Sequence, residues 1–158
     1  MELYQRLITF LDAHGARYRT IEHPPEGRTD RISAIRQTPL SQAAKALVVQ
    51  TVGRDTTSAY WLVVVPGDRR LKFPKVRLAT ESRRATMASM DQARALTGAE
   101  IGAIPPFSFR PKLRLIVDER LCAEEEIVFN AGRLDRSIVL VTEDYLRIAQ
   151  PHVRSVAE

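Results

Sequence analysis

Apolar residues recur along the chain at two different periods, and each period predicts one kind of element. Around Leu7 and Leu11 the spacing is that of an amphipathic helix, which Gly15 should end by adopting a left-handed conformation. Residues 45–52 and 60–65 are instead nearly unbroken apolar runs, joined by the loop Gly-Arg-Asp-Thr-Thr-Ser. Such runs are typical of central strands that are covered on both faces, and the loop predicts that they pair as a hairpin.

The rest of the chain predicts short strands and helices in irregular order. Further strands are expected at 18–22, 84–88, 113–118, 126–130 and 137–142. Further helices are expected at 33–36, at 75–81, at 90–96 after the capping box Ser89-Met90-Asp91-Gln92, and from Thr142 to just before Pro151. Because this order lacks a regular βαβ alternation, we expect a mixed α/β or α+β fold. A chain of 158 residues fits a single domain, residues 1–158.

Local signals add three expectations about where these elements begin and end. Asp30 or Ser33 is expected to cap the first short helix, and Thr142 the last one. The run Asn130-Ala131-Gly132 predicts a turn. The residues after Pro151 are expected to form a frayed tail.

Composition and charge narrow the class of protein. The chain has 24 Lys and Arg residues against 19 Asp and Glu, a formal net charge of +5, which is compatible with a nucleic-acid partner. The alternative is that clusters of cations such as 69–77 form an ordinary solvated surface. No apolar run is long enough to span a bilayer, the first residues lack the plan of a signal peptide, and Cys122 is the only cysteine. These features favour a cytoplasmic protein without a membrane partner or an internal disulfide.

Most motifs for cofactors and nucleophiles are absent from the sequence. The three histidines, including His23, are far apart and have no cysteine partners at ligand spacing, so we expect no metal. There is no Walker loop, no dinucleotide fingerprint and no Gly-x-Ser-x-Gly elbow, so we expect no cofactor. Glutamates follow Cys122 closely and should raise the pKa of its thiol, which makes it a poor nucleophile. His23 precedes a proline and is a candidate pocket residue, although an ordinary loop or core histidine is the alternative.

Lys45 is the first candidate for a functional side chain. It lies at the start of an apolar strand and shares a face with Leu47 and Val49, because side chains alternate along a strand. A lysine is rarely taken out of water without a partner, so its position suggests an anionic or strongly polar ligand. The alternative is that the stem of Lys45 covers apolar surface while its ammonium stays in water.

The second candidate is a loop within 101–111, whose first part is Gly102-Ala103-Ile104-Pro105-Pro106-Phe107. Glycine allows the backbone to approach a ligand closely, and the two prolines fix φ and hold one shape. Such a loop can aim the N–H groups of Ala103 and Ile104 at a carbonyl oxygen, as in an oxyanion hole. The alternative is a surface turn held in place by its phenylalanines.

Taken in order, these segments resemble the YbaK/ProX family of aminoacyl-tRNA deacylases, which are free-standing relatives of the editing domain of bacterial prolyl-tRNA synthetase. The resemblance extends from about Leu7 to Pro151. Its landmarks are Tyr18-Arg19, Glu22-His23-Pro24, Ala44 to Val49, Val65 to Leu71, Leu96-Thr97-Gly98, Gly102 to Pro106 and Phe129 to Arg133. Residues 102–109 and 144–151 look most like the YeaK-like branch, which implies action on small amino acids such as Ser or Thr.

The resemblance implies a mixed sheet, partly rolled like a barrel and flanked by helices. It implies hydrolysis of the ester that joins a wrong amino acid to the terminal adenosine of a tRNA, with no metal or cofactor. The near-invariant lysine of the family matches Lys45, which would position the terminal nucleotide and the amino acid. The G-x-x-x-P loop of the family matches Gly102 to Pro106, whose amides would hold the aminoacyl group. His23, Asn130 and Gly132 match further substrate-binding positions. The implied partners are the aminoacylated 3′ acceptor end of tRNA and an aminoacyl-tRNA synthetase.

Two positions depart from the family pattern. Pro105 stands where the family has a small residue such as Ser, and Ala46 follows the lysine where a hydroxyl or a longer side chain is common. Because proline has no N–H, Pro105 removes one possible donor from the loop. Two other functions stay open from the sequence: a module that binds acceptor ends or a synthetase without catalysis, and a hydrolase of a different small acyl ester.

Overall fold

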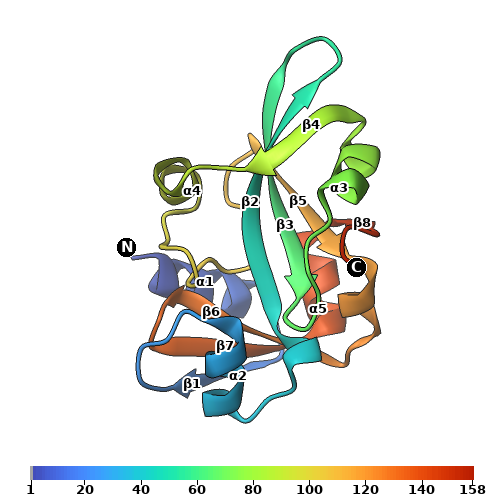
Figure 1. Ribbon diagram of the computed structural model, residues 1–158. Helices are drawn as coiled ribbons and strands as arrows, with labels where there is room; N and C mark the ends of the chain where they lie inside the picture. The colour runs from blue at the N-terminus through green and yellow to red at the C-terminus, as the bar shows by residue number, and fades with distance from the viewer. Residues whose placement is uncertain (1) are drawn as a thin grey trace.

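The structure is a computed structural model that describes residues 2–158 and has a mixed α+β architecture, as the sequence predicts (Figure 1). The helices are α1 Leu3–Ala13, α2 Thr29–Arg36, α3 Phe73–Thr80, α4 Met90–Thr97 and α5 Thr142–Ala149, with the 3-10 turns η1 Leu40–Gln42 and η2 Glu119–Ala123. The strands are β1 Tyr18–Glu22, β2 Ala44–Gly53, β3 Ser58–Pro66, β4 Ser82–Met87, β5 Leu113–Asp118, β6 Glu126–Arg133, β7 Arg136–Val141 and β8 His152–Arg154.

The strands form two sheets that do not close into a barrel. One sheet is antiparallel and has the order β1–β7–β6. The other has the order β4–β2–β3–β5–β8, in which β2 pairs antiparallel with β3 and β4, while β3–β5 and β5–β8 are parallel. An isolated bridge between Ala43 and Val128 joins the two sheets immediately before β2 begins.

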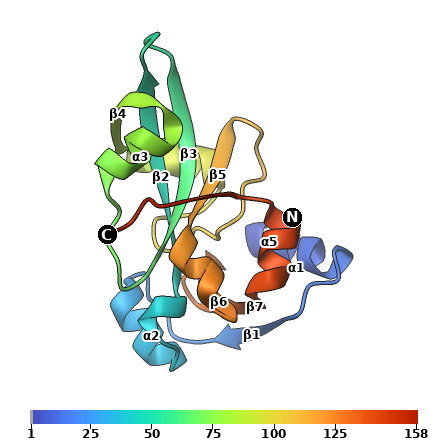
Figure 2. The same ribbon diagram turned by 90° about the vertical axis from the view of Figure 1, so that its right-hand side faces the viewer.

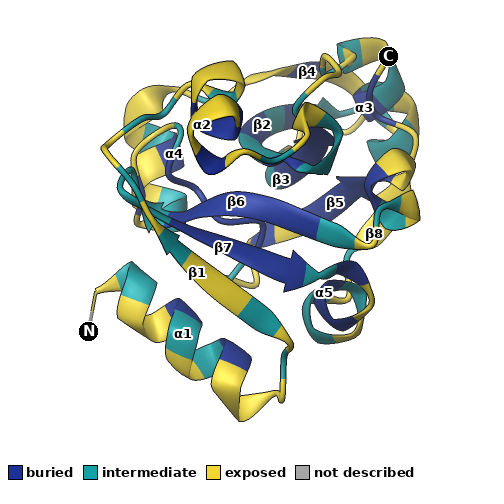
Figure 3. Ribbon diagram, turned by 90° about the horizontal axis from the view of Figure 1, so that it is seen from below, coloured by how far each residue is buried: buried dark blue, intermediate teal, exposed yellow. Residues whose placement is uncertain are grey.

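The hairpin β2–β3 is central because both of its faces are covered. One face, which includes Val48 and Val64, packs into the larger core together with Leu7 of α1. The opposite face, which includes Val49, packs against Val76 of α3. Seen from below, β6 and β7 are the buried strands of the smaller sheet, and α2 lies close to β6 and β2 (Figure 3). This corner between the two sheets is where the candidate site lies.

The turn predicted at Asn130-Ala131-Gly132 is wrong, because β6 continues through these residues. The pairing of β6 with β7 shifts register between Asn130 and Arg133, as in a β-bulge, and Gly132 has a φ of +80°. An Asn-x-Gly run suits a bulge as well as a turn, since both need a residue that tolerates positive φ.

The capping box at Ser89 is confirmed, whereas the caps predicted for α2 and α5 are wrong. Helix α2 begins at Thr29, with Arg28 at the N-cap position and no side-chain cap. Helix α5 follows Val141, while Thr142 is its first residue and has a buried Oγ1 without a partner among residues 2–158. Tertiary packing of the buried helix faces therefore decides where these helices begin, ahead of local capping preference.

The C-terminal residues are packed against the fold, which corrects the expectation of a frayed tail. Strand β8 pairs with β5, and the chain continues past β3 toward α3 (Figure 2). Val156 and Ala157 are fully buried, and their backbone N–H groups both donate to Asp118 Oδ1, at 2.9 and 3.0 Å. The partners in these hydrogen bonds are almost forty residues apart in the sequence, so no local pattern predicts them.

Candidate active site

A small cavity lies where α2, the start of β2, the loop at 101–104 and β6 meet. Its volume is about 120 Å³. Apolar walls come from residues such as Ile32, Ile104 and Val128, and the two cations that line it are Arg36 and Lys45. Pockets for whole cofactors or drug-sized ligands are several times larger, so this cavity suits a small side chain.

Lys45 is held at the edge of this cavity by the backbone of the β3–α3 connection. It lies opposite Val65 in the β2–β3 ladder, and its Nζ donates to the carbonyl oxygen of Arg69 at 3.4 Å. Burial lowers the pKa of the Lys45 ammonium, and the nearby charge of Arg70 lowers it further. The pKa of this half-buried ammonium is lowered by burial and by a second cation, and no carboxylate raises it. The ammonium can therefore still donate a hydrogen bond to an anionic or carbonyl oxygen of a ligand.

The loop at 101–106 approaches the cavity through Gly102. This glycine has a φ of +92°, and a Cβ placed there would lie 2.8 Å from the carbonyl oxygen of Gly27. The position therefore requires glycine for two reasons, its dihedral angle and its close contact with backbone. Gly102, Gly27 and Ile104 all line the cavity.

The amide donors of the loop are fewer than the sequence suggests. The N–H of Ala103 already donates to the carbonyl oxygen of Glu100 at 2.9 Å, so the expectation that it faces a ligand is wrong. Pro105 has no N–H to offer. The N–H of Ile104 makes no backbone hydrogen bond within residues 2–158, and Ile104 lines the cavity. One amide of the expected pair is therefore available.

Three contacts fix the loop against the rest of the molecule. Asn130 Nδ2 donates to the carbonyl oxygens of Gly102 at 2.8 Å and of Glu26 at 2.9 Å. The N–H of Gly132 donates to the carbonyl oxygen of Ala103 at 2.8 Å. The Tyr145 hydroxyl donates to the carbonyl oxygen of Pro106 at 2.8 Å. The loop is thus attached to β6 and α5 and presents one shape to the cavity.

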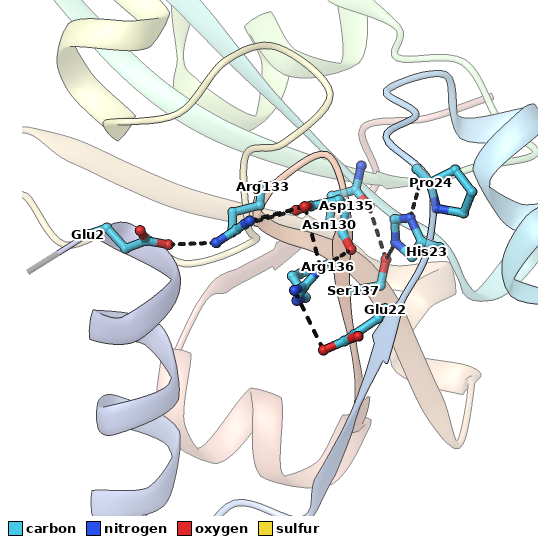
Figure 4. Close-up of polar contacts among 9 residues, drawn as sticks. All are labelled: Glu2, Glu22, His23, Pro24, Asn130, Arg133, Asp135, Arg136 and Ser137. Carbon is cyan, nitrogen blue, oxygen red and sulfur yellow. Dashed lines mark hydrogen bonds and ion pairs between the residues drawn. The ribbon is translucent and has the colours of Figure 1, made fainter.

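A polar cluster behind the cavity holds Asn130 in this position (Figure 4). Ser137 Oγ, which is fully buried on β7, donates to Asn130 Oδ1 at 3.0 Å and lies 2.7 Å from His23 Nε2. His23 Nδ1 lies 2.9 Å from the carbonyl oxygen of Pro24. His23 therefore contributes to the cavity through Ser137 and Asn130, and is not itself a lining residue.

The sequence-derived site residues fall into two groups. Those that line the cavity are Lys45, Gly102, Ile104 and Asn130. Those that lie behind it and support the loop or the polar cluster are His23, Ala103, Pro105, Pro106 and Gly132. Local sequence patterns predicted the lysine and the loop, and the tertiary structure shows which of their residues line the cavity and which lie behind it.

Arg36 also lines the cavity, and it is not among the site residues predicted from the sequence. It comes from the last turn of α2, is 7% exposed, and donates from Nη1 to Ser137 Oγ at 3.1 Å. The one available signal was its spacing, since Arg36 follows Ile32 by four residues and so shares the buried face of the helix.

Residues 2–158 lack both a metal-binding cluster and a membrane-spanning helix. Within this range, no three His, Cys, Asp or Glu side chains are grouped so that they could hold a metal ion. Within the same range, no helix has the length and apolar character needed to cross a membrane.

The fold is shared with a known crystal structure. The structure matches a crystal structure described as a candidate trans-editing enzyme for prolyl tRNA synthetase, with a TM-score of 0.82, 22% identity, and coverage of 100% of this chain and 98% of that chain. At this identity the match establishes the fold.

The sequence comparisons identify the family. The family model described as the aminoacyl-tRNA editing domain matches residues 23–148, and the chain belongs to this family. It is 42% identical to the multifunctional Ser/Thr-tRNA deacylase ProXp-y of Escherichia coli (strain K12), over 95% of this chain and 90% of that protein. It is 29% identical to a proline–tRNA ligase of Leuconostoc citreum (strain KM20), over 71% of this chain and 18% of the ligase. The resemblance inferred from the sequence is confirmed.

Proposed function

We propose that this protein is a trans-editing hydrolase that removes a small, wrongly attached amino acid such as Ser or Thr from the 3′ end of a tRNA. The observation that carries the proposal is that Lys45 and the Gly102 loop line one cavity of side-chain size. A chain of the editing-domain family that is 42% identical to a Ser/Thr-tRNA deacylase fits the same reaction.

In the proposed reaction, the aminoacyl side chain enters the cavity and the ester lies at its edge beside Lys45. A water molecule adds to the ester carbonyl, and the bond to the ribose oxygen breaks. The products are a free amino acid and a tRNA with a free hydroxyl. The Ile104 N–H and the Lys45 ammonium stabilise the negative charge that develops on the carbonyl oxygen. The neighbouring ribose hydroxyl helps to activate the water, so that most of the acceleration comes from positioning.

Replacement of Lys45 tests this assignment. Lys45→Ala is expected to lower the deacylation rate of seryl-tRNA at least about 100-fold, because it removes a charge that acts on the developing oxyanion. Thermal unfolding should show that the variant keeps its fold.

Lys112→Ala is the matched control for this replacement. Lys112 is exposed and precedes β5, whose first residue pairs with Tyr60, whereas Lys45 lies opposite Val65 at the other end of β3. The control should retain the wild-type rate. Wild-type turnover by the Lys45 variant would remove this lysine from the mechanism, and salt-sensitive tRNA binding without turnover by the wild type would indicate a binding module instead.

Three finer features belong to the same proposal. We propose that residues 1–158 act as one editing domain, and that it works in the cytoplasm, where aminoacyl-tRNA is made and used. We also propose that it acts alongside an aminoacyl-tRNA synthetase, on the ground that part of a proline–tRNA ligase resembles the chain. A pull-down of the synthetase with charged tRNA present, and again after nuclease treatment, would separate direct docking from a shared substrate.

A further inference from the structure

Arg36 is a buried cation whose hydrogen-bonding capacity is only partly used within residues 2–158. Its side chain lines the cavity although the residue is only 7% exposed. Nη1 donates to Ser137 Oγ at 3.1 Å, while Nε is buried and has no hydrogen-bond partner within residues 2–158. A guanidinium carries five N–H donors, so a buried guanidinium with so few acceptors is energetically costly.

The charge of Arg36 is also not balanced by a carboxylate. Burial lowers the pKa of the guanidinium to about 10, and no charged neighbour raises it. The group therefore remains protonated near neutral pH. Burying a charge without a counter-ion is costly unless hydrogen bonds compensate, and the cavity is the direction from which a further acceptor can come.

The polar side chains next to Arg36 already make hydrogen bonds with one another. Ser137 Oγ already contacts Arg36, His23 and Asn130. Asn130 Oδ1 accepts from Ser137, and Asn130 Nδ2 is a donor to backbone oxygens. Within residues 2–158, the side chains that hydrogen-bond with Arg36 and Ser137 are therefore engaged with one another, and none of them pairs with Arg36 Nε.

The size of the cavity limits what the acceptor can be. A volume of about 120 Å³ admits a side chain of two or three heavy atoms, whereas a phosphodiester would bring two riboses with it. Other walls of the cavity are apolar and include Ile32 and Val128. A side chain with one hydroxyl beside methylene or methyl groups matches both parts of this surface.

We propose that Arg36 donates a hydrogen bond to the side-chain hydroxyl of the seryl or threonyl group and so makes the site prefer hydroxyl-bearing amino acids. This inference rests on the proposed function, because it assumes that the cavity receives the aminoacyl side chain. Sites built to hydrogen-bond a substrate hydroxyl reject the analogue that lacks it, since their own polar group is then left unpaired.

The test compares substrates that differ by the hydroxyl alone. The kcat/KM of deacylation is measured for tRNA charged with serine or alanine, and for tRNA charged with threonine or 2-aminobutyrate. For the wild type the hydroxyl-bearing member of each pair should be preferred. In Arg36→Met, which keeps an unbranched stem and removes the donors, the ratio within each pair should fall about 10- to 100-fold. Arg36→Lys, which keeps a donor and the charge, should retain part of the ratio.

A control variant separates recognition from the general charge of helix α2. Arg31 is an exposed arginine on the same helix, and Arg31→Met should leave both ratios unchanged. If Arg36→Met does not fold, as judged by its thermal unfolding, the Lys variant and the wild type still decide the question. Non-hydrolysable seryl and alanyl amides of adenosine should then differ in affinity for the wild type, and should differ less for Arg36→Lys.

Each other outcome has a definite meaning. An equal loss on all four charged tRNAs would overturn the inference, because it would show that Arg36 serves the ester, a phosphate or the fold. Ratios that stay at the wild-type value in every Arg36 variant would overturn it as well. A wild type that deacylates none of the four would overturn the proposed function and this inference together, whereas a wild type that is active but has no hydroxyl preference would overturn the inference alone.

Discussion

At the scale of single residues, the cavity is distinguished by its unbalanced positive charge. Arg36 and Lys45 line it, and burial lowers the pKa of both without a carboxylate to oppose the shift. Elsewhere in residues 2–158, arginines such as Arg133 are held by carboxylates, in that case Asp135 at 2.8 Å. Positive charge that no carboxylate balances favours an oxyanion and hydrogen-bond acceptors on the substrate, and hydrolysis of an ester of a hydroxyl-bearing amino acid presents both.

One ion pair supports the fold and gives it a defined pH dependence. Asp144 accepts from the backbone and side chain of Arg17, which lowers its pKa to about 2. A depressed folded-state pKa stabilises the protein above the ordinary aspartate pKa, and this contribution disappears as the pH falls toward about 2. Asp144→Asn should therefore lower the free energy of unfolding by about 1–2 kcal/mol at pH 7, discounted because Arg17 is largely exposed.

Urea unfolding of the wild type and Asp144→Asn at a series of pH values tests this expectation. The difference between the two proteins should shrink as the pH is lowered from about 4 toward about 2. Glu143→Gln is the control, since the Glu143 side chain is 86% exposed and its contact with Arg17 is 3.9 Å long. A difference that is the same at every pH would mean that the carboxylate charge is not responsible.

At the scale of elements, the loop at 101–106 is held rigidly against β6 and α5 where it borders the cavity. Asn130 and Gly132 on β6 attach its first half, and Tyr145 on α5 attaches its second half. The prolines limit its backbone, so that the Ile104 N–H keeps a fixed direction. A loop fixed at both ends can position an ester with little loss of entropy on binding.

Two glycines with positive φ provide a matched test of this loop. At Gly102, φ is +92° and an added Cβ would lie 2.8 Å from backbone, whereas at Gly98, φ is +74° and nothing lies within 4 Å. Gly102→Ala should therefore displace the loop and lower kcat/KM at least about tenfold, while Gly98→Ala should cost about 1 kcal/mol of stability and leave activity unchanged. Equal activities of the two variants, measured on seryl-tRNA, would show that loop placement does not matter.

The C-terminal segment is an element whose removal should destabilise the whole protein. Deleting residues 152–158 exposes the surface that Val156 and Ala157 cover and leaves Asp118 Oδ1 without its two backbone donors. We expect a loss of about 2–5 kcal/mol in the free energy of unfolding, measured by urea denaturation. Glu158→Gln, which removes only an exposed pair with Lys72, should change it by less than about 0.5 kcal/mol. An unchanged midpoint for the deletion would contradict the packing described here.

At the scale of the whole molecule, the net charge of +5 and the cations next to the cavity should make tRNA recognition depend on salt. The loop that carries Arg69 and Arg70 contacts Lys45 directly through the Arg69 carbonyl oxygen. If two or three phosphates of the single-stranded end are contacted, kcat/KM for charged tRNA should fall about 7- to 20-fold between about 50 and 200 mM salt. A minimal aminoacyl ester, which has no phosphates, should show little change, and equal salt dependence of the two substrates would argue against phosphate contacts.

Several elements could be predicted from local patterns in the sequence. Continuous apolar runs fixed β2 and β3, the capping box at Ser89 fixed the start of α4, and glycine and proline marked the loop at 101–106. The sequence also singled out Lys45 as a candidate site residue, because an ammonium within an apolar strand differs from its immediate neighbours. These signals are local, since propensity, capping and side-chain alternation act over a few residues.

The tertiary structure alone decided which residues meet. Arg36 and Ser137 are 101 positions apart in the sequence. Arg36 is buried and lines the cavity only because the fold brings α2 and β7 together. The same is true of Asp118 and the C-terminal backbone, where the expected tail is instead the strand β8 followed by the buried residues Val156 and Ala157. Burial of a charge or a backbone donor is a property of the assembled core, because it depends on the partners that distant segments bring.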